Sequence, residues 1–107
     1  LARGMRYYLR ALFRSNGMPV NEYGAYPVDI HACAEGILCC AALADRFPHA
    51  RQQAIATLRW TYAHLRDRRT GAPWYRKYPF HTVRLVCPRW GVAWLYRALA
   101  EFLAHTA

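Results

Sequence analysis

Residues 23–35 read Tyr23-Gly24-Ala25-Tyr26-Pro27-Val28-Asp29-Ile30-His31-Ala32-Cys33-Ala34-Glu35. The first half, with its glycine, proline and tyrosines, is typical of a loop, and the second half starts a helix. Three ionisable residues, Asp29, His31 and Glu35, stand at this helix start. We therefore expect a ligand to bind where this loop meets the helix.

The last helix of the chain starts in the same way. The residues at that junction are Pro88-Arg89-Trp90-Gly91-Val92-Ala93-Trp94. Proline is favoured at the first position of a helix, and aromatic and basic side chains follow it here. The two helix starts predict one ligand-binding end of a helical bundle.

Apolar residues recur at helical spacing in four segments. The predicted helices span 1–15, 28–46, 50–66 and 90–105. Asn16-Gly17 ends the first helix, and Pro48 closes the second. Alternation between Trp74 and Val86 allows a short β-hairpin about residues 74–86. The predicted fold class is all-α, with two antiparallel helical hairpins.

The four helices differ in how much of their surface is apolar. The segments 28–46 and 90–105 are apolar almost all round, whereas 1–15 and 50–66 are amphipathic. Helices that are apolar all round are buried, so the second and fourth are expected to be the inner ones. This alternation predicts an arc of an α/α toroid with the loops before both inner helices on one rim. A small independent bundle is the other interpretation.

The length of 107 residues and the 55% hydrophobic content fit a single domain with its own core. The chain begins with Leu1, inside a helix-like pattern. We therefore expect it to be part of a longer protein. Contact with further helices of that protein, or self-association, is then expected.

The net charge of +9 favours an anionic partner. Arg3, Arg6, Arg10 and Arg14 form one basic stripe on the first helix, but the other basic residues are spread along the chain. A solvated basic face is the simpler interpretation.

The four cysteines, Cys33, Cys39, Cys40 and Cys87, do not form the paired spacing of a zinc site. We predict no metal and no cofactor, and free thiols in a reducing cytoplasm. The longest apolar run, Gly36 to Ala44, is too short to cross a bilayer, so a membrane partner is not expected.

Asp29, His31 and Glu35 are the candidate catalytic residues. Asp29 has two interpretations, a helix N-cap or a catalytic carboxylate. His31 and Glu35 are four residues apart and share a helix face, so they form either a polar pair or part of a site. Carboxylates and an imidazole in a cleft suit the general acid and base catalysis of sugar hydrolysis or epimerisation.

The candidate substrate-binding residues are Tyr26, Tyr75, Arg89, Trp90 and Trp94. Arg89 suits a carboxylate or phosphate, and the aromatic rings suit the faces of sugars, although core packing also explains the tryptophans. The strip Tyr75-Arg76-Lys77-Tyr78 has the composition of a single-strand nucleic-acid site. No nucleic-acid-binding motif accompanies it, so nucleic acid is not the expected partner.

Three motifs in order carry a resemblance. They are Tyr26-Pro27-Val28-Asp29-Ile30-His31-Ala32-Cys33-Ala34, Trp74-Tyr75-Arg76, and Arg89-Trp90-Gly91-Val92-Ala93-Trp94-Leu95-Tyr96-Arg97-Ala98-Leu99. This order resembles the C-terminal part of a bacterial family of long helical proteins associated with polysaccharide biosynthesis, some members of which are labelled delta-aminolevulinic acid dehydratase.

The resemblance implies an α/α toroid of the six-hairpin glycosidase type. By position it places the shared motif residues at Asp29, His31, Arg89, Trp90 and Trp94. It implies a carbohydrate or acidic glycan as the partner, bound or processed by a glycoside hydrolase-like or sugar epimerase-like toroid. The alternative hypothesis is a basic helical module that binds an acidic protein or nucleic acid.

Overall fold

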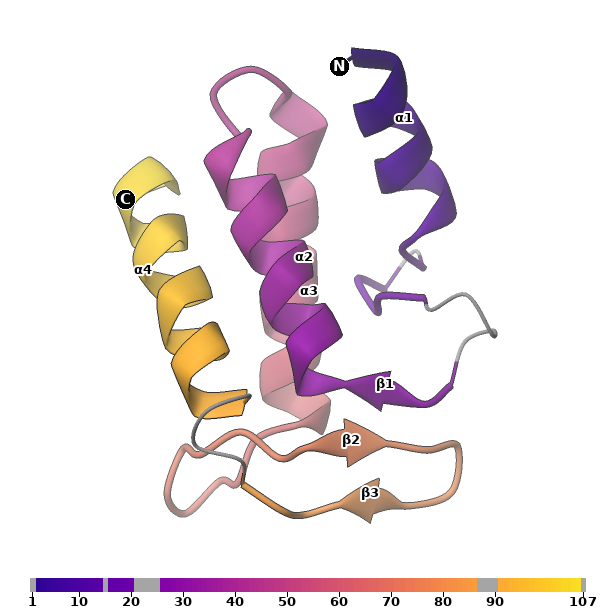
Figure 1. Cartoon of the computed structure of the whole chain (residues 1–107), viewed down its shortest axis with the longest axis vertical. Helices are drawn as coiled ribbons and strands as arrows, with labels where there is room; N and C mark the ends of the chain where they lie inside the picture. The colour runs from indigo at the N-terminus through magenta and orange to yellow at the C-terminus, as the bar shows by residue number, and fades with distance from the viewer. Residues whose placement is uncertain (1, 15, 21–25, 87–90, 107) are drawn as a thin grey trace.

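The computed structural model describes residues 2–14, 16–20, 26–86 and 91–106. In these residues the chain is mostly helical, with four α-helices and a small antiparallel sheet below them (Figure 1). The helices are α1 (Ala2–Ala11), α2 (Ile30–Ala42), α3 (Pro48–His64) and α4 (Ala93–Thr106). The strands are β1 (Val28–Asp29), β2 (Arg76–Lys77) and β3 (Thr82–Val83).

The central helix is α2. It packs against α3, which runs antiparallel to it, and against α4, which runs in the same direction as α2 (Figure 1). Its side chains are apolar except for His31 and Glu35, so it is stable only when neighbouring elements cover it. Its buried residues are Ile30, Cys33, Ala34, Gly36, Ile37, Cys40 and Ala41.

The predicted bounds of the first two helices were wrong. The first helix ends at Ala11 and not near residue 15, because the chain doubles back and Phe13 pairs with Pro19 in an antiparallel bridge. The second begins at Ile30, because the two residues before it are extended and belong to β1. It ends at Ala42 and not at residue 46.

The predicted role of Pro48 was also wrong. Pro48 begins α3 and does not close the helix before it. The first N–H groups of a helix have no partner within the helix, so a proline there loses no hydrogen bond. The third helix therefore spans Pro48–His64 in place of 50–66, and the fourth Ala93–Thr106 in place of 90–105.

The β-hairpin predicted about residues 74–86 is confirmed as β2 and β3. A third strand, β1, pairs with β2 and was not predicted; Val28 lies opposite Lys77 and Asp29 opposite Arg76. The sheet order is β1-β2-β3. Because α2 follows β1 directly, the sheet holds the start of α2. The starts of α2 and α4 lie at the same end of the molecule, as expected (Figure 1).

Burial of the last helix differs from the prediction. Among the described side chains of α4, only Leu95 and Ala98 are buried, whereas Trp94, Tyr96 and Leu103 are exposed. The reason is that α4 packs mainly against α2. It is an outer helix of the described structure, although its composition suits an inner one.

The buried side chains form two adjoining clusters. The cluster at the sheet end contains Ile30, Ile37, Trp60 and Leu95, and the cluster beside α1 contains Met5, Phe13, Cys40 and Ala54. Phe102 of α4 packs against both. The hydrophobic core is thus continuous along α2.

A glycine allows the segment after α1 to reach the core. Gly17 has a φ of 94°, and its carbonyl accepts a hydrogen bond of 2.8 Å from the buried Thr57 hydroxyl of α3. A Cβ atom on Gly17 would lie 2.4 Å from the backbone of Ala56. Only glycine fits both this conformation and this contact.

We expect Gly17→Ala to destabilise the fold by about 3 kcal/mol, which combines a left-handed backbone with an overpacked contact. The control is Gly71→Ala. Gly71 also has a positive φ, of 77°, but nothing lies within 4 Å of its Cβ position. The free energy of unfolding of the Gly71→Ala variant should fall by only about 1 kcal/mol. Urea unfolding measures both, and equal losses would contradict the close approach of residue 17 to α3.

Candidate functional site

Six of the eight predicted site residues lie in the described structure, and five of these fall into two groups. Asp29 and Tyr75 lie at the sheet, whereas His31, Glu35 and Trp94 meet between α2 and α4. Tyr26 packs against the core cluster at the sheet end. Arg89 and Trp90 lie outside the described residues.

Asp29 is the N-cap of α2. Its Oδ1 accepts a hydrogen bond of 2.8 Å from the backbone N–H of Ala32, which the helix itself leaves without a partner. Its Oδ2 lies 3.6 Å from the guanidinium of Arg76. The cap interpretation is confirmed. The catalytic role stays a prediction, and both carboxylate oxygens already have partners within the protein.

Arg76 of β2 joins the aromatic residues of the sheet to Asp29. Its guanidinium donates a hydrogen bond of 3.5 Å to the Tyr78 hydroxyl and lies 4.8 Å from the centre of the Tyr75 ring. The bond to Tyr78, and then the nearby Tyr75 and Asp29, raise the pKa of Arg76 against the opposing effect of burial. The Tyr75 ring therefore packs against the Arg76 guanidinium within the protein.

The second group joins the starts of two helices. Nε2 of His31 lies 3.2 Å from Oε1 of Glu35, one turn further along α2. The His31 ring meets the Trp94 ring edge to face, with 5.4 Å between centroids and 89° between planes. The side chain of Glu35 is 62% exposed and that of His31 is 32% exposed. The pair can therefore meet a ligand from solvent.

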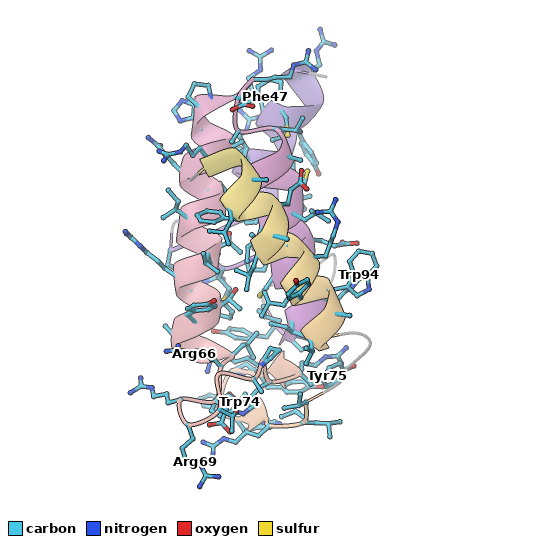
Figure 2. All side chains as sticks on the ribbon, turned by 90° about the vertical axis from the view of Figure 1, so that its left-hand side faces the viewer. Phe47, Arg66, Arg69, Trp74, Tyr75 and Trp94 are labelled. Atoms are coloured by element: carbon cyan, nitrogen blue, oxygen red, sulfur yellow. The ribbon has the colours of Figure 1, made fainter. Side chains whose placement is uncertain are left out.

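A groove of about 490 Å³ runs between α1, α2 and α4 beside this pair. Its lining residues are Tyr8, Glu35, Leu38, Cys39, Ala42, Trp94, Arg97 and Glu101. A smaller hollow of about 150 Å³ adjoins it and shares Tyr8 and Glu35 with it. Figure 2 shows Trp94 projecting from the first part of α4 toward solvent.

The groove has polar groups on an apolar wall. Arg97 donates a hydrogen bond of 2.6 Å to Glu101, four residues on. Burial, and then the nearby Cys40, Cys39 and Glu35, raise the pKa of Tyr8 above its usual range, so its hydroxyl is neutral at physiological pH. Phe13 holds the Tyr8 ring by an edge contact, with 5.0 Å between centroids.

Sequence reasoning missed six of the eight residues that line this groove, among them Tyr8, Arg97 and Glu101. Tyr8 belongs to the apolar stripe of the first helix, which is typical of core packing. Arg97 and Glu101 stand four residues apart, a spacing that predicts their ion pair but not its place in a groove. No local pattern indicates that α1 and α4 meet the same face of α2.

Comparison with protein-family models, with curated proteins and with solved structures finds no match to this chain. The resemblance to polysaccharide-associated helical proteins therefore stays a prediction. The function has to be argued from the groove and from the charges around it.

Within the described ranges, no three His, Cys, Asp or Glu side chains are grouped so that they could hold a metal ion. None of the described helices has the length and apolarity needed to cross a bilayer.

The described cysteines, Cys33, Cys39 and Cys40, are free thiols, and Cys87 lies outside the described residues. Burial raises the pKa of Cys33 and of Cys40 to about 12. Burial, and then Glu35, raises the pKa of Cys39. These thiols are protonated at neutral pH, so none of them is an activated nucleophile.

We expect Asp29→Ala to destabilise the fold by about 1 kcal/mol through loss of the N-cap. Asp29→Asn keeps a capping oxygen and loses only the negative charge opposite Arg76. The free energy of unfolding should therefore fall less in this variant than in Asp29→Ala. Urea unfolding with far-ultraviolet circular dichroism measures both variants. An Asn variant as unstable as the Ala variant would contradict the cap as the main role of Asp29.

We expect the free energy of unfolding to fall as the pH rises from 9 toward 12. The folded state holds the thiol protons of Cys33 and Cys40 to about pH 12, whereas the unfolded chain releases them near the ordinary pKa of 9.0. The folded state then binds more protons, so alkali favours unfolding. Cys40→Ala should make this decline shallower in unfolding curves measured at several pH values, and an unchanged slope would exclude Cys40 as a cause.

Proposed function

We propose that this chain binds a neutral carbohydrate in the groove between α1, α2 and α4. The observation that supports this best is that Tyr8 and Trp94 line the same groove as the carboxylates of Glu35 and Glu101. The C–H faces of a sugar ring are apolar and pack on aromatic rings, while its hydroxyls donate to carboxylates. A pocket of this size with a few polar groups on an apolar wall is typical of small-ligand sites.

The charges in the groove favour a neutral sugar over an acidic one. Two carboxylates, Glu35 and Glu101, and one guanidinium, Arg97, line it. The groove is therefore net negative, although the chain as a whole carries +9. A uronate or sulfate would meet Glu35, which is mostly exposed and repels an anion. Hydroxyl groups meet no such penalty.

The shape of the groove favours more than one sugar ring. The main groove of about 490 Å³ and the hollow of about 150 Å³ adjoin at Tyr8 and Glu35. A ligand that spans both would pass over these two side chains. We therefore expect an oligosaccharide to bind better than a single sugar.

The proposal assigns binding, and not turnover, to this chain. Both oxygens of Asp29 have partners within the protein, and His31 with Glu35 forms one polar pair at the edge of the groove. Glycoside hydrolysis uses two carboxyl groups on either side of the bond that breaks. The other carboxylate of the groove, Glu101, accepts a hydrogen bond from Arg97, so both carboxylates of the groove have partners within the protein. This arrangement supports recognition of hydroxyl groups.

The proposal also includes the toroid arc. Its support is that α2 and α4 lie side by side and run in the same direction, as adjacent inner helices of a toroid do. The exposed side chains of Tyr96 and Leu103 on α4 are then available to a further hairpin or to a second copy.

We expect Trp94→Ala to weaken binding of neutral oligosaccharides about tenfold, because it removes an aromatic face from the groove. Calorimetric titration with neutral oligosaccharides at low and high salt measures this effect. Binding should resist salt, because the ligand carries no charge.

The matched control is Tyr96→Ala. Tyr96 lies two residues further along α4, is 75% exposed and does not line the groove. This variant should bind as the original chain does. Equal effects of the two substitutions, or no binding of any neutral sugar, would overturn the proposal.

A further inference from the structure

A group of basic residues lies at the sheet end. Segment 66–86 contains six of the fifteen basic residues and one acidic residue, Asp67. The basic residues are Arg66, Arg68, Arg69, Arg76, Lys77 and Arg84. Figure 2 shows Arg66 and Arg69 at the same end of the molecule as Trp74 and Tyr75. This end is therefore strongly positive.

Most of these charges are available to a ligand. Arg68, Arg69 and Arg84 are exposed, and Lys77 is half-buried. None of the ion pairs formed among the described residues involves any of these four. Asp67 is occupied locally, because it accepts a hydrogen bond of 2.8 Å from the backbone N–H of Arg69.

Aromatic rings are interleaved with these cations. Phe80, at the turn between β2 and β3, is 99% exposed, which is unusual for a large apolar side chain. Next to it the rings of Tyr78 and His81 are stacked, with 4.8 Å between centroids and 12° between planes. A hydrogen bond of 2.8 Å from Tyr78 N–H to the His81 carbonyl closes this turn.

A hollow of about 620 Å³ lies against the hairpin. Its lining residues are Lys77, Pro79, Phe80, His81, Thr82 and Arg84. The guanidinium of Arg84 also lies 5.0 Å from the centre of the Trp74 ring, which holds the cation at this edge. One hollow therefore combines two positive charges with a freely accessible aromatic face.

We propose that the β2–β3 hairpin binds single-stranded nucleic acid. The phosphates lie on Lys77 and Arg84, and a base stacks on Phe80. Surfaces that bind single strands combine such charges with aromatic rings, and stacking tolerates any base because each base has a π-face. A duplex hides these faces inside its stack, and a sulfated glycan has none.

This inference goes beyond the proposed carbohydrate function and does not depend on it. The helix groove and the hairpin hollow share no lining residue. The groove is net negative and its ligand neutral, whereas the hairpin is positive and its ligand anionic. Trp94→Ala tests the first site and Phe80→Ala tests the second, so either can fail alone.

The experiment is fluorescence anisotropy of a labelled oligothymidine with the full chain at several salt concentrations. We expect Phe80→Ala to weaken binding about tenfold through loss of base stacking. Lys77→Gln with Arg84→Gln should reduce the slope of log affinity against log salt by about 1.4, the value for two phosphate contacts on a single strand. Phe80 buries almost nothing, so the melting temperature of Phe80→Ala should not change.

The matched control is Arg3→Gln with Arg6→Gln. It removes the same charge from exposed positions on α1, which begins at the end of the molecule opposite the sheet (Figure 1). Affinity should fall less than twofold. An equal loss in this control would show that the overall charge alone attracts the strand and would overturn the proposal.

Two competitors separate the remaining outcomes. A duplex of equal length and heparin should each displace the strand poorly. If heparin competes equally well and Phe80→Ala has no effect, the hairpin is a general polyanion surface, and the proposal is wrong. Absence of any binding at low salt would overturn it as well.

Discussion

Burial of α2 is the constraint on which the rest of the structure depends. A helix of mostly apolar side chains has to be covered, and α3, α4 and the segment after α1 cover it. Gly36 permits the last of these contacts, because a Cβ there would lie 3.0 Å from the Phe13 ring. The residues of α2 that still reach solvent are His31, Ala32, Glu35, Leu38, Cys39 and Ala42. Four of these six residues line the groove, and Ala32 lines the hollow beside it, so the candidate site is largely the part of α2 that its neighbours leave uncovered.

The groove and the sheet end carry net charges of opposite sign. Along the helices, Glu35 and Glu101 make the groove net negative, whereas arginines and a lysine make the sheet end positive. Asp29 ends β1, caps α2 and lies 3.6 Å from Arg76 of β2. This carboxylate, the pairing of β1 with β2 and a hydrogen bond of 2.8 Å from the Ile30 N–H to the Tyr75 carbonyl together hold the start of α2 against the hairpin. A neutral, hydroxyl-rich ligand and an anionic ligand would meet the protein on separate surfaces.

Local patterns predicted the four helices, the β-hairpin about residues 74–86 and the cap at Asp29, because each depends on neighbouring residues. The contacts that build the site depend on distant ones. Val28 and Asp29 form a strand only because β2 lies beside them. A segment of two residues is too short to show the alternation of apolar and polar side chains from which a strand is predicted. Trp94 meets His31 through the packing of α4 on α2. A proline at position 48 is compatible with the end of one helix or with the start of the next. Because the chain turns before Pro48, this proline begins α3.

The pairing of β1 with β2 also has a consequence for the order of folding. Val28 and Lys77 are neighbours in the sheet, but α2 and α3 lie between them in the chain. Closing so long a loop has a high entropic cost unless a helical hairpin first brings its ends together. We expect the α2–α3 hairpin to form early and the sheet to assemble late. The short strands are then the first part to open in local unfolding, so the Asp29–Arg76 contact reports completion of the native state.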